Sequence, residues 1–70
     1  MTGPEKIKWL RTSLQMTTHE FGIAIGLRGR SAITKYEKGY RKPSFETLAR
    51  IIKLAKQYNI KVAPQELRPL

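Results

Sequence analysis

Helix start and stop signals recur at short intervals along this chain, and they limit each helix to a few turns. Thr17 is a preferred helix N-cap, and Glu20, three residues later, completes a capping box. Gly26 and Gly39 are typical of helix C-termini, because glycine readily adopts the left-handed conformation that closes a helix. Ser44 is a second N-cap signal. The spacing of these signals predicts a series of short helices.

Apolar residues between these signals recur with helical spacing. Ile7, Leu10 and Leu14 lie at i, i+3 and i+7, and Leu48 and Ile51 belong to a similar stripe. We expect helices over residues 4–14, 18–25, 31–38 and 45–58. In the tail, both a short fifth helix from residue 64 and a brief extended piece over residues 60–62 fit the sequence. The predicted fold is all-α: one domain over residues 1–70, a compact bundle of four to five short helices with a central helix-turn-helix.

The charge of the chain favours a polyanionic partner. Its 70 residues carry a formal net charge of +9 and give a pI near 10.4, which suits DNA, RNA or an anionic membrane surface. The absence of cysteine and the presence of one histidine exclude disulfides, thiolate metal sites and a histidine zinc cluster. We therefore expect no metal and no cofactor. No signal peptide and no apolar run of membrane-spanning length is evident, so a cytoplasmic location is expected.

The basic stretch from Gly26 to Pro43 contains one acid, Glu37, and no second acid, nucleophile or metal cluster accompanies it. We therefore do not expect an enzyme. The sequence GLRG within this stretch lacks the spacing of a nucleotide-binding P-loop. It does match the G-x-x-G loop of RNA-binding KH modules, but those need a sheet, and no strand pattern appears in the first 58 residues.

Two segments resemble the lambda-repressor and Cro-like (XRE) helix-turn-helix family. They are MTTHEFGIAIGL and ITKYEKGYRKPSFETL, and the similarity extends over residues 6–55. The run E-x-G-x-x-x-P-S that follows the isoleucine of the third helix is its most specific part. The chain departs from the family in two places: Gly26 and Ile33 are seven residues apart instead of six, and Thr18 replaces the usual glutamine.

The resemblance implies a role for three groups of residues. One group faces base edges in the DNA major groove: Arg30, Ser31, Thr34 and Lys35, with Arg28 in the turn at a flanking base or a phosphate. A second group contacts phosphates: Thr17, Thr18, Lys38, Tyr40, Arg41 and Lys42. Arg11 and Glu37 form the third, a structural ion pair between the first and third helices.

The function implied is that of a sequence-specific regulator of transcription that binds double-stranded DNA. The resemblance favours a repressor of the phage or mobile-element kind, acting as a homodimer on a two-fold-related operator. Apolar residues of the fourth helix and of the tail, residues 59–70, would supply the dimer surface: Tyr58, Ile60, Val62, Leu67 and Leu70. An alternative is an antitoxin-type module that binds a partner toxin and autoregulates its operon; a stable one-to-one complex with a co-encoded protein would favour it.

Overall fold

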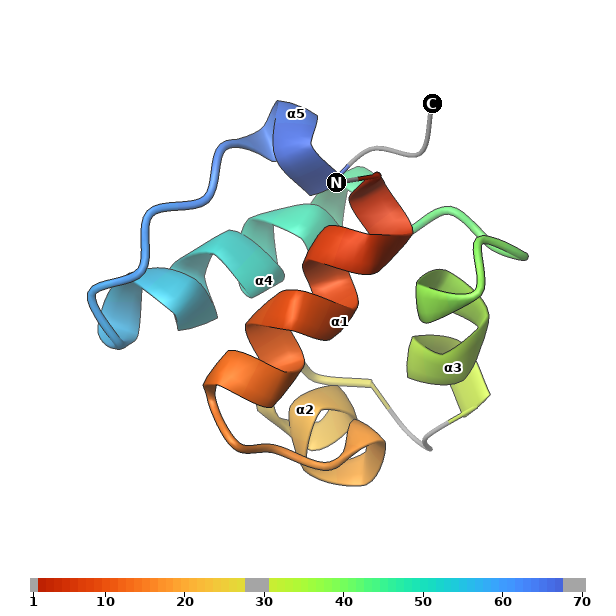
Figure 1. Cartoon of the computed structure of the whole chain (residues 1–70), viewed down its shortest axis with the longest axis horizontal. Helices are drawn as coiled ribbons and strands as arrows, with labels where there is room; N and C mark the ends of the chain where they lie inside the picture. The colour runs from red at the N-terminus through yellow and green to blue at the C-terminus, as the bar shows by residue number, and fades with distance from the viewer. Residues whose placement is uncertain (1, 28–30, 68–70) are drawn as a thin grey trace.

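The computed structural model describes residues 2–27 and 31–67, and this part of the chain is helical with no strand (Figure 1). Its helices are α1 (Gly3–Ser13), α2 (Thr18–Ala24), α3 (Ser31–Glu37), α4 (Phe45–Gln57) and α5 (Pro64–Leu67). The all-α prediction is confirmed, and the predicted helix bounds differ from these by one residue at most. Of the two alternatives for the tail, the structure has the short helix, α5, while residues 60–63 have no regular structure.

Hydroxyl side chains start three of the helices. Thr2 and Thr17 accept the backbone amides of Glu5 and Glu20 at 3.2 and 3.1 Å, and both glutamates bond back to the threonine amide at 2.9 Å. Ser44 accepts the amide of Thr47 at 3.2 Å. The predicted caps at Thr17 and Ser44 are therefore confirmed, and α1 has a capping box of the same kind.

Helices α1 to α4 close in one way, with a residue of positive φ directly after the cap. These residues are Gln15, Gly26, Gly39 and Asn59, with φ between 57° and 80°. The next amide then bonds to the carbonyl five residues back, as from Leu27 to Gly22 at 2.8 Å and from Tyr40 to Lys35 at 2.9 Å. This is the Schellman closure, and it is why glycine suits positions 26 and 39.

The core brings together side chains from every helix. Ile7, Phe21, Ile33, Ile51 and Leu67, one from each helix in chain order, are at most 1% exposed. In Figure 1, α1 crosses in front of α4, with α2 below and α3 to the right, while α5 covers the N-terminal end of α1. The packing therefore leaves α3 with one side on the core and one side on the surface.

The tail completes this core, which corrects part of the expected dimer surface. Val62 is 8% exposed and Leu67 is fully buried, so neither can supply apolar area to a second copy. A chain this short needs the apolar residues of its tail to cover its own core. Ile60 packs partly buried against the core, Tyr58 is 53% exposed, and Leu70 lies outside the described residues.

Candidate nucleic-acid interface

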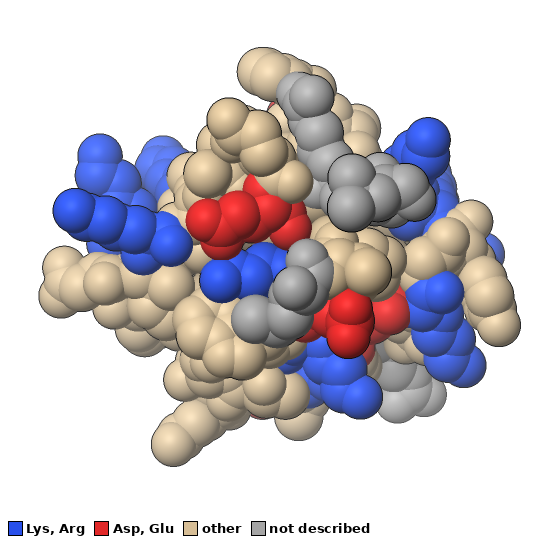
Figure 2. Space-filling model, turned by 45° about the horizontal axis from the view of Figure 1, so that its top comes forward, with Lys and Arg blue, Asp and Glu red and all other residues tan. Residues whose placement is uncertain are grey.

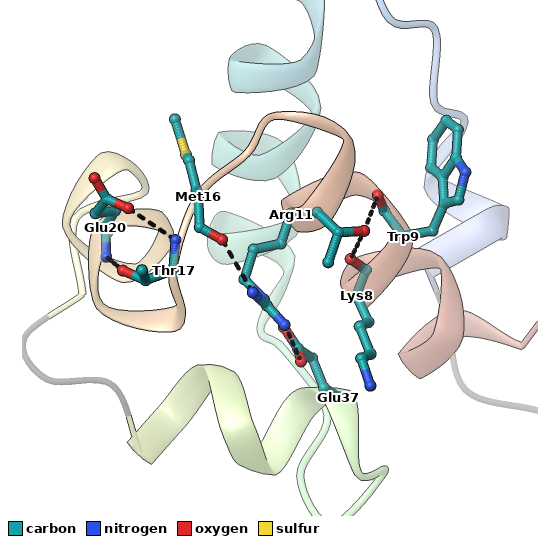
Figure 3. Close-up of polar contacts among 8 residues, drawn as sticks. Lys8, Trp9, Arg11, Met16, Thr17, Glu20 and Glu37 are labelled. Carbon is teal, nitrogen blue, oxygen red and sulfur yellow. Dashed lines mark hydrogen bonds and ion pairs between the residues drawn. The ribbon is translucent and has the colours of Figure 1, made fainter.

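The guanidinium of Arg11 connects three segments of the helix-turn-helix (Figure 3). Its Nε donates to Glu37 Oε2 at 2.6 Å and its Nη2 donates to Oε1 at 3.2 Å, while Nη1 donates to the carbonyl of Met16 at 2.9 Å. Arg11 lies in the last turn of α1, Met16 precedes α2, and Glu37 ends α3. The structure thus brings the two expected partners together, and their contacts fix α2 and α3 relative to α1.

The orientation of α3 follows from its two buried side chains. Ile33 is fully buried and Tyr36 is 4% exposed, and both pack into the core. Since helical residues three or four apart share a face, the opposite side of α3 presents Ser31, Lys35 and Lys38 to solvent.

A shallow hollow lies on this outer side of α3 and of the loop that follows it. It is lined by Ser31, Thr34, Lys35, Lys38 and Tyr40. Three of these are predicted base contacts and two are predicted phosphate contacts. The fold therefore gathers five predicted DNA-binding residues at one surface, with two ammonium groups among three hydroxyl groups.

The loop after α3 extends this surface. Tyr40 is 78% exposed, and its backbone amide bonds to the carbonyl of Lys35, so its backbone is held at the C-terminus of α3. Arg41 and Lys42 follow and are also exposed. These residues carry cations and a phenolic hydroxyl, all groups that bind phosphate oxygens.

At the start of α2, the two predicted phosphate contacts lie in different environments. The hydroxyl of Thr17 accepts the amide of Glu20, and the amide of Thr17 donates to the carboxylate of Glu20. The backbone amide of Thr17, and after it the Thr17 side chain, stabilise the Glu20 carboxylate and lower the pKa of Glu20, which stays ionised beside the helix N-terminus. Thr17 therefore acts as a cap, whereas the half-buried Thr18 directly follows it as the first helical residue.

Arg28 and Arg30, the other two predicted base contacts, lie outside the described residues. The longer spacing between Gly26 and Ile33 falls on this same segment.

Arg50 of α4 is a residue of this region that the sequence reasoning missed. Its Nη1 donates to the carbonyl of Ile25 at 3.4 Å, and its Nη2 pairs with Glu46 at 2.7 Å. A Cβ at Gly26 would collide with this guanidinium. The i, i+4 spacing of Glu46 and Arg50 signals their pairing, but a contact across 25 residues of chain leaves no local signal.

Comparison with known families agrees with this geometry. The family model described as helix-turn-helix matches residues 7–64, which is most of the chain. Searches of curated proteins and of solved structures gave no match. Within residues 2–27 and 31–67, none of the helices has the length and hydropathy of a membrane span, and no three His, Cys, Asp or Glu side chains are grouped as metal ligands. The chain belongs to the lambda-repressor and Cro-like (XRE) helix-turn-helix family of DNA-binding transcription regulators.

Proposed function

We propose that this regulator is a repressor that reads a specific DNA sequence with the outer side of α3. The observation that carries the proposal is the hollow in which Ser31, Thr34, Lys35, Lys38 and Tyr40 meet. A surface of this kind can present hydrogen-bond donors to base edges at its centre and to phosphates at its margin. Arg11, paired with Glu37 behind it, orients α3 without reaching the DNA.

The roles at the base edges follow from the chemistry of the side chains. Lys35 donates to the O6 and N7 acceptors of guanine, which face the major groove. Ser31 and Thr34 bond to a base or pack their carbon atoms against a thymine methyl group. Arg30, directly before Ser31 in the sequence, would hold a guanine bidentately, and Arg28 would reach a flanking base or a phosphate.

The phosphate contacts fix the register of the protein on the duplex. We assign them to Lys38, Tyr40, Arg41 and Lys42, all exposed after α3, and to Thr18 at the start of α2. Thr17 contributes chiefly as the N-cap of α2, because its amide is bonded to the carboxylate of Glu20. Phosphate contacts of this kind supply affinity that does not depend on sequence.

The protein would act as a homodimer on a two-fold-related operator. The described part of α3 has seven residues, and one short helix reads only a few base pairs. Two copies, with their recognition helices about 34 Å apart along one face of the duplex, multiply the specificity. This activity would take place in the cytoplasm, where the DNA of a bacterium or a phage is transcribed.

The test compares duplex from directly upstream of the protein's own gene with random duplex of equal length. We expect the upstream duplex to bind at least about a thousandfold more tightly, with two copies per site. Lys35→Ala should reduce this ratio, whereas the control Lys53→Ala, an exposed lysine of α4, should leave it unchanged. Equal affinity for the two duplexes would refute sequence-specific recognition.

A further inference from the structure

An apolar groove runs along α4, between this helix and the chain that follows it. The groove consists of two hollows that share Ile52. One is lined by Phe45, Leu48, Ala49, Ile52 and Pro64, and the other by Ile52, Lys56, Asn59, Ile60, Lys61, Val62, Ala63 and Glu66. None of the proposed DNA contacts lines either hollow.

The groove has the dimensions of a binding site for a helix. Phe45, Ala49, Ile52 and Lys56 follow one another at helical spacing on one side of α4. At a rise of about 1.5 Å per residue, this stripe is about 17 Å long, which matches about three turns of a bound helix. Phe45 at one end is 82% exposed, a large apolar area for a surface position. Grooves of this kind bind amphipathic helices by their apolar face.

The charges at the groove are positive. Lys56 and Lys61 line it and are exposed, and neither forms an ion pair with a described residue. The one acid of the groove, Glu66, is already paired with Lys6 of α1 at 3.2 Å. The groove therefore combines an apolar floor with two cations that form no ion pair with a described residue.

A second copy of this chain is a poor source of carboxylates for these cations. The chain has five acids, and each is engaged within its own fold: Glu5 and Glu20 in capping boxes, and Glu37, Glu46 and Glu66 in ion pairs. Figure 2 shows acidic side chains in the middle of one face, with lysines and arginines directly beside and below them as well as toward both edges. Two copies docked through this groove would bring like charges together, which opposes association.

We propose that this groove binds an acidic amphipathic helix of another protein. The apolar face of that helix would cover Ala49, Ile52 and Ile60, and carboxylates along its flank would pair with Lys56 and Lys61. The groove and the hollow on the outer side of α3 share no lining residue, so the partner and DNA would use different residues of the regulator. The inference rests on the groove alone and stands apart from the proposed operator recognition.

The test uses two designed helical peptides and the full chain. Both peptides are about 14 residues long and carry leucines at i, i+3, i+4 and i+7; one has glutamates along its flanks and the other has lysines at the same positions. Fluorescence anisotropy measures the affinity of each labelled peptide. We expect the glutamate peptide to bind at least about tenfold more tightly than the lysine peptide.

Charge-reversal variants distinguish binding of the peptide in the groove from attraction to the net positive charge of the protein. Lys56→Glu and Lys61→Glu should each lower the affinity ratio of the two peptides by about fivefold. Lys53→Glu is the matched control, since Lys53 is exposed on the same helix but lies outside the groove. Ala49→Glu, at another exposed position of α4, should abolish binding of the glutamate peptide while circular dichroism shows an unchanged fold.

Three results would overturn the proposal. The first is an equal loss of the affinity ratio in Lys53→Glu and Lys56→Glu, which would show that net charge alone causes the binding. The second is no binding of either peptide by the folded chain. The third is dimerisation of the free protein, detected by sedimentation and abolished by Ala49→Glu, which would assign the groove to a second copy. Operator binding by the same variants is measured separately. A result against peptide binding in the groove can therefore be told apart from a result against operator recognition.

Discussion

At the scale of single residues, Gly26 and Gly39 are required for their backbone conformation, with φ of +80° and +77°. A Cβ at Gly26 would also meet the guanidinium of Arg50, but this is the far end of a flexible side chain that is 48% exposed and can move aside. A Cβ at Gly39 would meet only Pro4 Cγ at an ordinary 3.5 Å. We therefore expect Gly26→Ala and Gly39→Ala each to lower the free energy of unfolding by about 1 kcal/mol, measured by urea denaturation.

A double variant tests whether Arg50 contributes to the cost at Gly26. In Gly26→Ala, Arg50→Ala the cost of the alanine at position 26, relative to Arg50→Ala alone, should stay at the level of Gly39→Ala, so the effects of the two substitutions should add. A cost that falls markedly when Arg50 is removed would show that the guanidinium also enforces the glycine.

The ion pair of Arg11 and Glu37 should also make a measurable contribution to the free energy of unfolding. The two side chains are 15% and 9% exposed, and two hydrogen bonds join them. We expect Glu37→Ala to lower the free energy of unfolding by about 3 kcal/mol, because it leaves a largely buried guanidinium without its counter-ion. The exposed pair of Glu46 and Arg50 is the comparison, and Glu46→Ala should cost less than about 1 kcal/mol. Similar losses in the two variants would contradict a special role for Arg11 and Glu37.

At the scale of the element, the capping box of α2 makes the stability of the helix depend on pH. The amide and hydroxyl of Thr17 lower the pKa of Glu20 in the folded protein. The stabilisation that ionised Glu20 gives to the folded protein is therefore fully present above the unfolded pKa of about 4.3, and it is lost as the pH falls through the lower folded pKa. The stability difference between the wild type and Glu20→Gln should shrink in this window, as followed by denaturation from about pH 7 to about pH 2.5.

A control for this pH dependence removes the hydrogen-bond partner instead of the acid. In Thr17→Ala the side-chain bond to Glu20 is absent, so the pKa of Glu20, followed by NMR titration, should rise toward its ordinary value. An unchanged pKa in this variant would show that the hydroxyl of Thr17 has no part in the shift.

Local chemistry explains why most of the elements could be predicted from the sequence. Capping residues such as Thr17 and Ser44 act within three residues of themselves, and Gly26 and Gly39 act on the turn directly before them. Gln15 ends α1 with a φ of 57° although its residue type gives no such signal. The helix there ends because the chain must turn back into α2, a tertiary requirement that overrides local preference.

At the scale of the whole molecule, the sequence was least informative where distant segments share one surface. The burial of Val62 and Leu67 depends on how the tail returns to the bundle, so their apolar character alone suggested an exposed interface instead. The contact of Arg50 with Ile25 likewise depends on how segments distant in the sequence pack together, so the sequence did not predict it. The outer side of α3 was easier to predict, because the helical period separates Ile33 and Tyr36 from Lys35 and Lys38 within a single element.

The distribution of charge over the whole molecule leads to a prediction about salt. Each phosphate contact that a lysine or arginine makes releases condensed counter-ions, so the logarithm of the DNA affinity should fall linearly with the logarithm of salt concentration. Lys42→Ala should weaken binding to all duplexes alike and reduce this slope by about 1. Lys56→Ala, in the groove along α4, removes the same charge at a residue that does not line the hollow on α3 and should leave the slope unchanged. Equal changes in slope for the two variants, measured by fluorescence anisotropy across a salt series, would show that net charge rather than the loop after α3 makes the phosphate contacts.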